Sequence, residues 1–180
     1  AHARVVQQAF EAGVVVPLRF PTVVPSIDAT VRELVRPRRD SLLRTLGRLE
    51  GLEEVRLRAT YDEGPAVLEA LAASPRLAKL RGRPGAEHRL GEMIVAELRH
   101  RAVQDSQALL FAIRPLIEDA MIDSVGGEHD VLIASLLVRR GGGRAVDETA
   151  ERWAAGRPPV RIRVVGPLPP YSFAAINEES

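Results

Sequence analysis

Few residues in this 180-residue sequence could carry out catalysis or bind a metal. There is no cysteine, which excludes disulfides, thiolate metal sites and cysteine nucleophiles. None of the four histidines has the spacing of a zinc motif: His2, His88, His100 and His129. We therefore expect the histidines to be solvated or locally hydrogen-bonded rather than metal ligands.

Five carboxylates gather around a predicted turn at Gly126-Gly127, and they are Glu118, Asp119, Asp123, Glu128 and Asp130. Opposed carboxylates can bind a divalent cation, but this spacing is not that of a calcium loop. Acidic side chains are also typical of a solvated hairpin turn. The sequence thus predicts a turn here, with a metal site as the alternative.

The run Gly141-Gly142-Gly143 precedes a predicted helix, where a phosphate could be cradled. It lacks the Lys-Ser/Thr pair of a P-loop and the spacing of a dinucleotide fingerprint, so we interpret it as a hinge. No serine stands in a nucleophile elbow. We predict a protein that is not an enzyme and needs no cofactor. The alternative is a small-ligand or metal-dependent enzyme on a ferredoxin-like scaffold.

The composition also limits the partners. The formal net charge is +1, so no overall field attracts nucleic acid or anionic lipid. RNA recognition on a small sheet would need aromatic residues on the central strands, where only Tyr61 is found. No apolar run approaches the ~20 residues of a membrane span, and no secretory signal opens the chain. We expect a cytoplasmic protein with no nucleic-acid partner and no membrane partner.

The elements that must position any site follow from hydrophobic periodicity. Residues 55–61 alternate as an amphipathic strand, 87–113 form one long helix, and 131–138 form a strand buried on both faces. A weaker strand (117–125), a helix (145–155) and a last strand (160–165) complete the set. The order strand, helix, strand, strand, helix, strand predicts a ferredoxin-like (split βαβ) α+β domain. The strands 55–61 and 131–138 are then central, the last strand lies at an edge, and two helices cover one face.

Three regions follow from this interpretation. Residues 1–25 are expected to be the remnant of a small α+β N-terminal domain, with a helix over 5–12 and a buried strand over 14–20. Residues 26–168 form the ferredoxin-like domain with leading helices, the first of them kinked by Pro37. Residues 169–180 form a C-terminal tail.

One face of the predicted sheet combines arginine with aliphatic residues. Arg56, Arg58, Arg161 and Arg163 point away from the helices, and a neighbouring strand is apolar on the same side. A sheet face of this composition is usually covered by another segment of the chain or by another protein. Either the N-terminal segment or the tail of this chain covers it, or it is a docking surface for another protein.

The stretch Gly166-Pro167-Leu168-Pro169-Pro170-Tyr171-Ser172-Phe173 is unusual in its own right. A glycine and three prolines should end the last strand abruptly and continue as a stiff extended segment. Tyr171 and Phe173 then stand at a fixed distance from the sheet. They either fold back as an intramolecular plug or offer a hydrophobic anchor to another chain.

This stretch resembles the C-terminal signature of the gas vesicle protein F/L family, usually Gly-Pro-Trp-Pro-Pro-Tyr-Ser-Phe, with Leu168 in place of Trp. Two further matches occur in the family's order. Val15-Val16-Pro17-Leu18-Arg19-Phe20-Pro21-Thr22 is similar to Val-Leu-Pro-Leu-Arg-Phe-Gly-Thr, with Pro21 in place of Gly. Gly51-Leu52-Glu53-Glu54-Val55-Arg56-Leu57-Arg58 is similar to Gly-x-x-Glu-Val-x-Val-Lys.

The resemblance implies a non-enzymatic accessory or minor structural protein of gas vesicle assembly, located in the cytoplasm and associated with the vesicle. Its implied partners are the hydrophobic major shell protein and other vesicle accessory proteins. The residues expected to bind them are Arg19, Phe20, Arg56, Arg58, Arg161, Arg163, Pro169, Pro170, Tyr171 and Phe173.

Overall fold

The computed structural model describes residues 2–17, 26–123, 127 and 129–174. Within these residues a four-stranded antiparallel sheet is built from β1 (Leu52–Tyr61), β2 (Asp119–Ile122), β3 (Asp130–Arg139) and β4 (Val160–Leu168). The strand order is β2-β3-β1-β4, so β1 and β3 are central and β4 lies at an edge. The α+β class and the predicted places of the first, third and last strands are confirmed.

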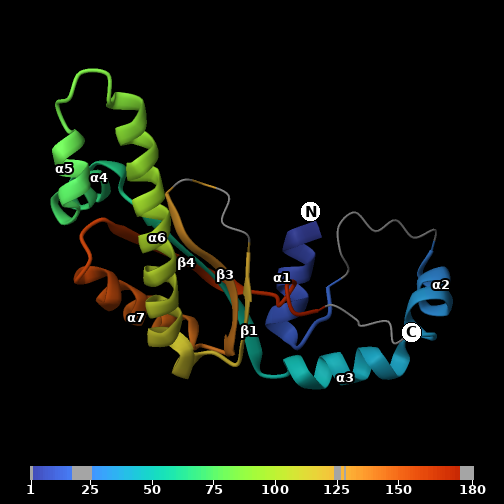
Figure 1. The fold of residues 1–180 in the computed structure, drawn as a ribbon. Coiled ribbons are helices and arrows are strands. Elements are labelled where there is room, and N and C mark those ends of the chain that lie inside the picture. The colour runs from blue at the N-terminus through green and yellow to red at the C-terminus, as the bar shows by residue number, and fades with distance from the viewer. Residues whose placement is uncertain (1, 18–25, 124–126, 128, 175–180) are drawn as a thin grey trace.

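Helices cover one face of this sheet (Figure 1). α6 (Glu87–Ile113) and α7 (Gly143–Ala155) pack against β3 and β4 respectively, while α4 (Glu63–Ala73) and α5 (Pro75–Leu80) pack against α6. α6 has the predicted bounds, and a 3-10 turn, η2 (Arg114–Leu116), follows it. The element order and the strand order are together those of a split βαβ arrangement.

The N-terminal elements lie on the opposite side of the sheet (Figure 1). They are α1 (His2–Ala12), α2 (Ile27–Thr30), the π-helical segment η1 (Val31–Val35) and α3 (Arg39–Leu49). The predicted break at Pro37 is a turn over residues 36–38, between η1 and α3. Arg140 joins α1 to the sheet, since its guanidinium lies 4.7 Å from the Phe10 ring centroid and donates a 2.8 Å hydrogen bond to the Phe10 carbonyl.

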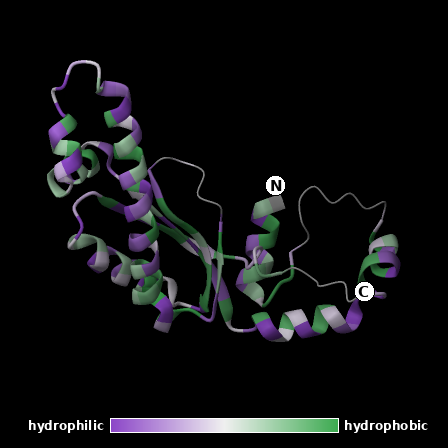
Figure 2. Cartoon of the chain, viewed as in Figure 1, coloured by the Kyte–Doolittle hydropathy of each residue, from purple (hydrophilic) through white to green (hydrophobic). Residues whose placement is uncertain are grey.

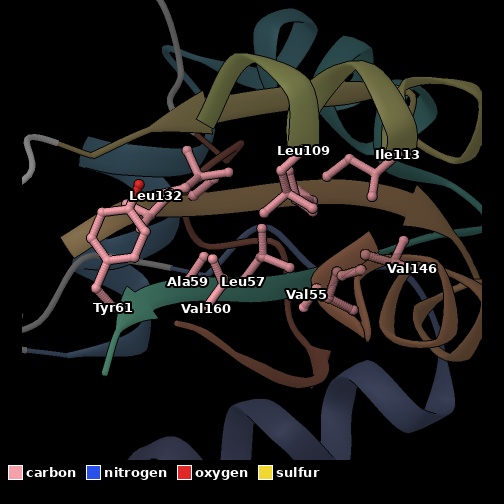
Figure 3. Close-up of a cluster of buried hydrophobic side chains, with 14 of the residues drawn as sticks. Val55, Leu57, Ala59, Tyr61, Leu109, Ile113, Leu132, Val146 and Val160 are labelled. Carbon is pink, nitrogen blue, oxygen red and sulfur yellow. The ribbon is translucent and has the colours of Figure 1, made fainter. Parts of the chain in front are cut away.

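The main core lies between the sheet and α6 (Figure 3). Leu57 of β1, Leu136 of β3, and Leu109 and Ile113 of α6 are all fully buried. Burying a side chain of this size stabilises a fold by ~1.5–3 kcal/mol. The core forms here because the central strands are largely hydrophobic, whereas the helices carry both hydrophobic and hydrophilic residues (Figure 2).

Tyr61 closes one end of this core (Figure 3). Its hydroxyl donates a 2.7 Å hydrogen bond to Asp105 Oδ2 on α6. Burial, followed by the hydrogen bond to this carboxylate, raises the pKa of the Tyr61 hydroxyl far above its ordinary value of about 10. The phenol is therefore neutral in the folded protein at every physiological pH.

Replacing Tyr61 by phenylalanine is expected to lower the free energy of unfolding by about 1–2 kcal/mol at pH 7, because a hydrogen bond to a charged group is removed. The raised pKa adds stability that is complete below pH 10 and declines above it, as the unfolded chain ionises first. The gap between wild type and Tyr61→Phe should therefore narrow above about pH 10. Urea unfolding at a series of pH values measures this. Tyr171→Phe, at an exposed tyrosine, is the control and should show no such trend.

Three predicted strands differ from the structure. The strand predicted over 117–125 is only β2, Asp119–Ile122, and residues 124–125 lie outside the described part. Residues 14–17 of the predicted strand 14–20 have no regular secondary structure, and residues 18–20 lie outside the described part. The last strand does not stop at Gly166 but continues to Leu168, with a bulge in its pairing to β1 between Glu54 and Arg56. Pro167 is compatible with this position because β4 is an edge strand.

Candidate functional site

The sheet has a second face, turned away from α4–α7, which we call the open face. The register places residues of all four strands on it: Arg56 lies opposite Ser135, Met121 opposite Ser135, and Arg58 opposite Arg163. The four predicted arginines are indeed brought together here, and all of them are exposed. The open face consists of Glu54, Arg56, Arg58, Met121, Asp123, Ile133, Ser135, Leu137, Arg161, Arg163 and Val165.

Two of these arginines bind carboxylates of the predicted acidic cluster. Arg56 Nη2 lies 2.7 Å from Asp123 Oδ2, and Arg58 Nη2 lies 2.9 Å from Asp130 Oδ1. Burial raises the pKa of Asp130, but hydrogen bonds from Arg58 and from the Gly127 N–H outweigh it, so the net pKa is lowered. These carboxylates are thus neutralised by arginine. Glu128 lies outside the described residues, among which no group of His, Asp or Glu is arranged to hold a metal ion.

The remaining arginines of the open face come from the edge strand. Arg161 binds Asp62, with 2.8 Å between Nη2 and Oδ2. Arg163 has no ion pair or hydrogen bond from its side chain within the described residues. Val165 on the same strand is 42% exposed, and Met121 on β2 is 48% exposed. The exposed aliphatic side chains of the open face therefore lie on its two edge strands, with Arg56 and Ser135 of the central strands between them.

The C-terminal tail covers one end of the open face. Phe173 is 3% exposed, and it packs in a second hydrophobic cluster with Leu49, Leu137 and Ala174. Val14 and Val16 pack against the same cluster. Phe173 thus folds back into this chain, which is the first of the two alternatives left open by the sequence.

The other predicted residues of the tail are placed differently. Pro169 and Pro170 are buried, whereas Tyr171 is 39% exposed at the border of the covered region. Arg19 and Phe20 lie outside the described residues. Of the tail residues proposed to touch a partner, Tyr171 is the accessible one.

A buried glutamate fastens the tail to β1. Glu54 is 4% exposed, and its two carboxylate oxygens accept hydrogen bonds from the Ser172 N–H at 2.9 Å and the Ser172 hydroxyl at 2.8 Å. The hydroxyls of Ser172 and Ser135 are also hydrogen-bonded, at 3.0 Å. We call this set, Glu54, Ser135 and Ser172, the tail latch.

The tail latch and the second cluster bring together the three sequence motifs that resemble the gas vesicle protein F/L family. Val16 belongs to the first motif, Glu54 to the second, and Ser172 and Phe173 to the third. No pattern within a single motif predicts this contact between the three. The one signal available in the sequence was Glu54, a charged residue directly before the alternation that begins at Val55.

Comparison with known proteins agrees with these motifs. A family model described as "Gas vesicle synthesis protein GvpL/GvpF" matches residues 1–175. This chain belongs to the GvpL/GvpF family. The predicted resemblance is thereby confirmed over nearly the whole sequence.

Two GvpL/GvpF relatives come from Streptomyces sp. (strain CB03234). Its gas vesicle protein F is 28% identical over 183 residues, covering 96% of this chain and 75% of that protein. Its gas vesicle protein L is 29% identical over 190 residues, covering 99% of this chain and 69% of that protein. The similarity therefore spans the helices, the sheet and the tail.

Solved GvpF structures share the fold. GvpF from Anabaena sp. PCC7120 gives a TM-score of 0.79 at 23% identity, covering 98% of this chain and 74% of that chain. GvpF from Microcystis aeruginosa gives 0.74 at 21% identity, covering 97% and 76%. Among the described residues of this GvpL/GvpF member, no helix is both long and apolar enough to cross a membrane.

Proposed function

We propose that this GvpL/GvpF-family protein is a non-enzymatic accessory protein of gas vesicle assembly, which binds the hydrophobic shell protein and other vesicle proteins in the cytoplasm, at the vesicle. The observation that carries the proposal is the uncovered part of the open face. Arg163 and Val165 on β4 and Met121 on β2 are exposed there, on the two edge strands of the sheet. Arginine stems and aliphatic side chains together suit an apolar partner with a polar rim.

The tail has a supporting part in this proposal. Phe173, Pro169 and Pro170 are buried, so they hold the tail against the sheet and bind the partner only indirectly. Tyr171 extends the uncovered surface with an amphipathic ring, the kind of side chain enriched in interfaces. Arg56 and Arg58 on the central strand β1, and Arg161 on β4, are paired with carboxylates and supply the charged part of the face.

Capture of the shell protein tests the proposal. The double variant Arg163→Glu/Val165→Asp should reduce the amount of co-expressed shell protein that co-purifies by about tenfold, because a tenfold weaker affinity is the usual effect of changing an important interface side chain. Neither residue has an ion-pair partner within the described chain, so the fold should tolerate both changes. Arg152→Glu, at an exposed arginine of α7 on the other side of the sheet, is the matched control. Equal capture by the double variant and the control would exclude the open face as the binding surface.

A further inference from the structure

A second buried glutamate stands beside Glu54 and has no partner within the described residues. Glu53 is 4% exposed, as Glu54 is, but it points to the helix side of the sheet. Its carboxylate makes no hydrogen bond or ion pair in the part of the chain that the structure describes, whereas Glu54 accepts two hydrogen bonds. Among the described residues the one enclosed side-chain atom without a partner is His129 Nδ1, so the Glu53 oxygens are reached by solvent and can accept hydrogen bonds from outside the chain.

Glu53 forms the floor of a pocket of about 390 Å³. Val55 stands beside it on the buried floor, and the exposed rim includes Asp147 of α7 and Gly166 of β4. A pocket of this size lies at the small end of the range for ligand sites. The floor is buried and the rim is exposed, so the pocket is a pit that opens to solvent.

Two glycines keep this pit open. A Cβ on Gly143 would stand 2.9 Å from Val55 Cγ1 and 3.5 Å from Glu53 Oε1, and a Cβ on Gly166 would stand 2.7 Å from Val55 Cγ1. Either Cβ would force the floor to shift. Gly143 belongs to the glycine run that the sequence suggested as a phosphate cradle or a hinge.

The charge of the pit excludes the phosphate and favours a cation. Glu53 and Asp147 are both acidic, and the one basic side chain in the lining, Arg144, is bound to Glu148 at 2.7 Å. The N-terminus of α7 contributes only about half a positive charge. Val55 and Val164 supply apolar walls on the way to Glu53.

We propose that this pit binds a basic side chain, the guanidinium or ammonium group of an arginine or lysine offered by another protein. The apolar walls receive the hydrocarbon stem and Glu53 accepts the charged hydrogen bonds, which are the strong kind. The pit lies on the opposite side of the sheet from the open face, so this site neither rests on the proposed function nor fails with it.

Titration with blocked amino acids tests the site on the whole chain. Nα-acetyl-arginine amide or Nα-acetyl-lysine amide should cause saturable amide shifts at Val55, Gly143 and Gly166 in nitrogen-15 spectra. Nα-acetyl-norleucine amide, which has the stem without the charge, should not. Glu53→Gln should weaken binding by about tenfold or more, because a charge-assisted hydrogen bond is removed. Glu151→Gln, at an exposed glutamate of α7, should bind as wild type does.

Several results would overturn the site. No saturable shift with either basic probe would mean that water alone fills the pit, and equal shifts with the norleucine probe would mean that charge has no part. Equal binding by Glu53→Gln would remove Glu53 from the site. Finally, Glu53→Gln should be at least as stable as wild type, since it breaks no pairing within the described chain. A clear drop in its melting temperature would mean that Glu53 stabilises the fold by accepting a hydrogen bond from α7, and that it is not a ligand-binding group.

Discussion

Replacing Phe173 by alanine is expected to lower the free energy of unfolding by about 3 kcal/mol, within the range for truncating a buried phenylalanine. The ring is 3% exposed and packs with Leu49 and Leu137, which belong to α3 and β3. Its removal takes away the packing by which the tail holds these elements. Val14 and Val16 pack against the same cluster, so the N-terminal segment should loosen as well. Urea unfolding followed by circular dichroism measures the change.

Tyr171→Ala is the matched control for this prediction. Tyr171 lies two residues earlier in the same tail but is 39% exposed, so the expected decrease is below about 1 kcal/mol. One result would contradict the conclusion that Phe173 packs within this chain. If Phe173→Ala unfolded as wild type does while shell-protein capture fell, Phe173 would be an anchor for another chain.

Local pattern was enough to predict the elements that form the core. The alternation of residues 55–61 placed Val55, Leu57 and Ala59 inward, and all three are fully buried. The apolar run 131–138 predicted a central strand, because a strand buried on both faces cannot lie at an edge. Once the elements were in order, the split βαβ arrangement determined which strands are neighbours.

Contacts between distant segments could not be predicted in the same way. An apolar run such as residues 14–17 is typical of a strand, but the same run can also pack as an irregular segment against a cluster. Whether Phe173 plugs the fold depends on a hydrophobic site made by Leu49 and Leu137, which lie more than thirty residues from it. No periodicity in the tail contains that information.

The ion pairs of the open face could not be predicted from local sequence pattern either. The positions of Arg56 and Arg58 followed from alternation, but their ion pairs with Asp123 and Asp130 depend on the register between β1 and the neighbouring strands. The acidic cluster was therefore a candidate metal site by sequence, whereas Asp123 and Asp130 bind arginine in the structure. Register is set by the whole sheet, and a single strand does not reveal it.

The tail latch gives the second large effect. Glu54→Gln is expected to lower the free energy of unfolding by about 2 kcal/mol, because hydrogen bonds to a charged group contribute ~1.5–3 kcal/mol. A glutamine has one acceptor oxygen, so its amide N–H₂ must face either the Ser172 N–H, which can only donate, or the Ser172 hydroxyl, which would have to rotate and accept. Both are donors to Glu54, at 2.9 and 2.8 Å. Thermal and urea unfolding measure the decrease, and the Ser172→Ala variant should share most of it in a double-mutant cycle.

The neighbouring Glu53 is the sharpest control for this change. It lies on the same strand and is exposed to the same 4%, but it has no hydrogen-bond partner within the described chain. Glu53→Gln breaks no hydrogen bond or ion pair within the described chain, so its stability should equal or exceed that of wild type. If burial alone governed both positions, the two variants would be destabilised equally, and the tail latch would then have no special role. Destabilisation at Glu54 alone would show that the carboxylate–serine contact holds the C-terminal segment onto the sheet.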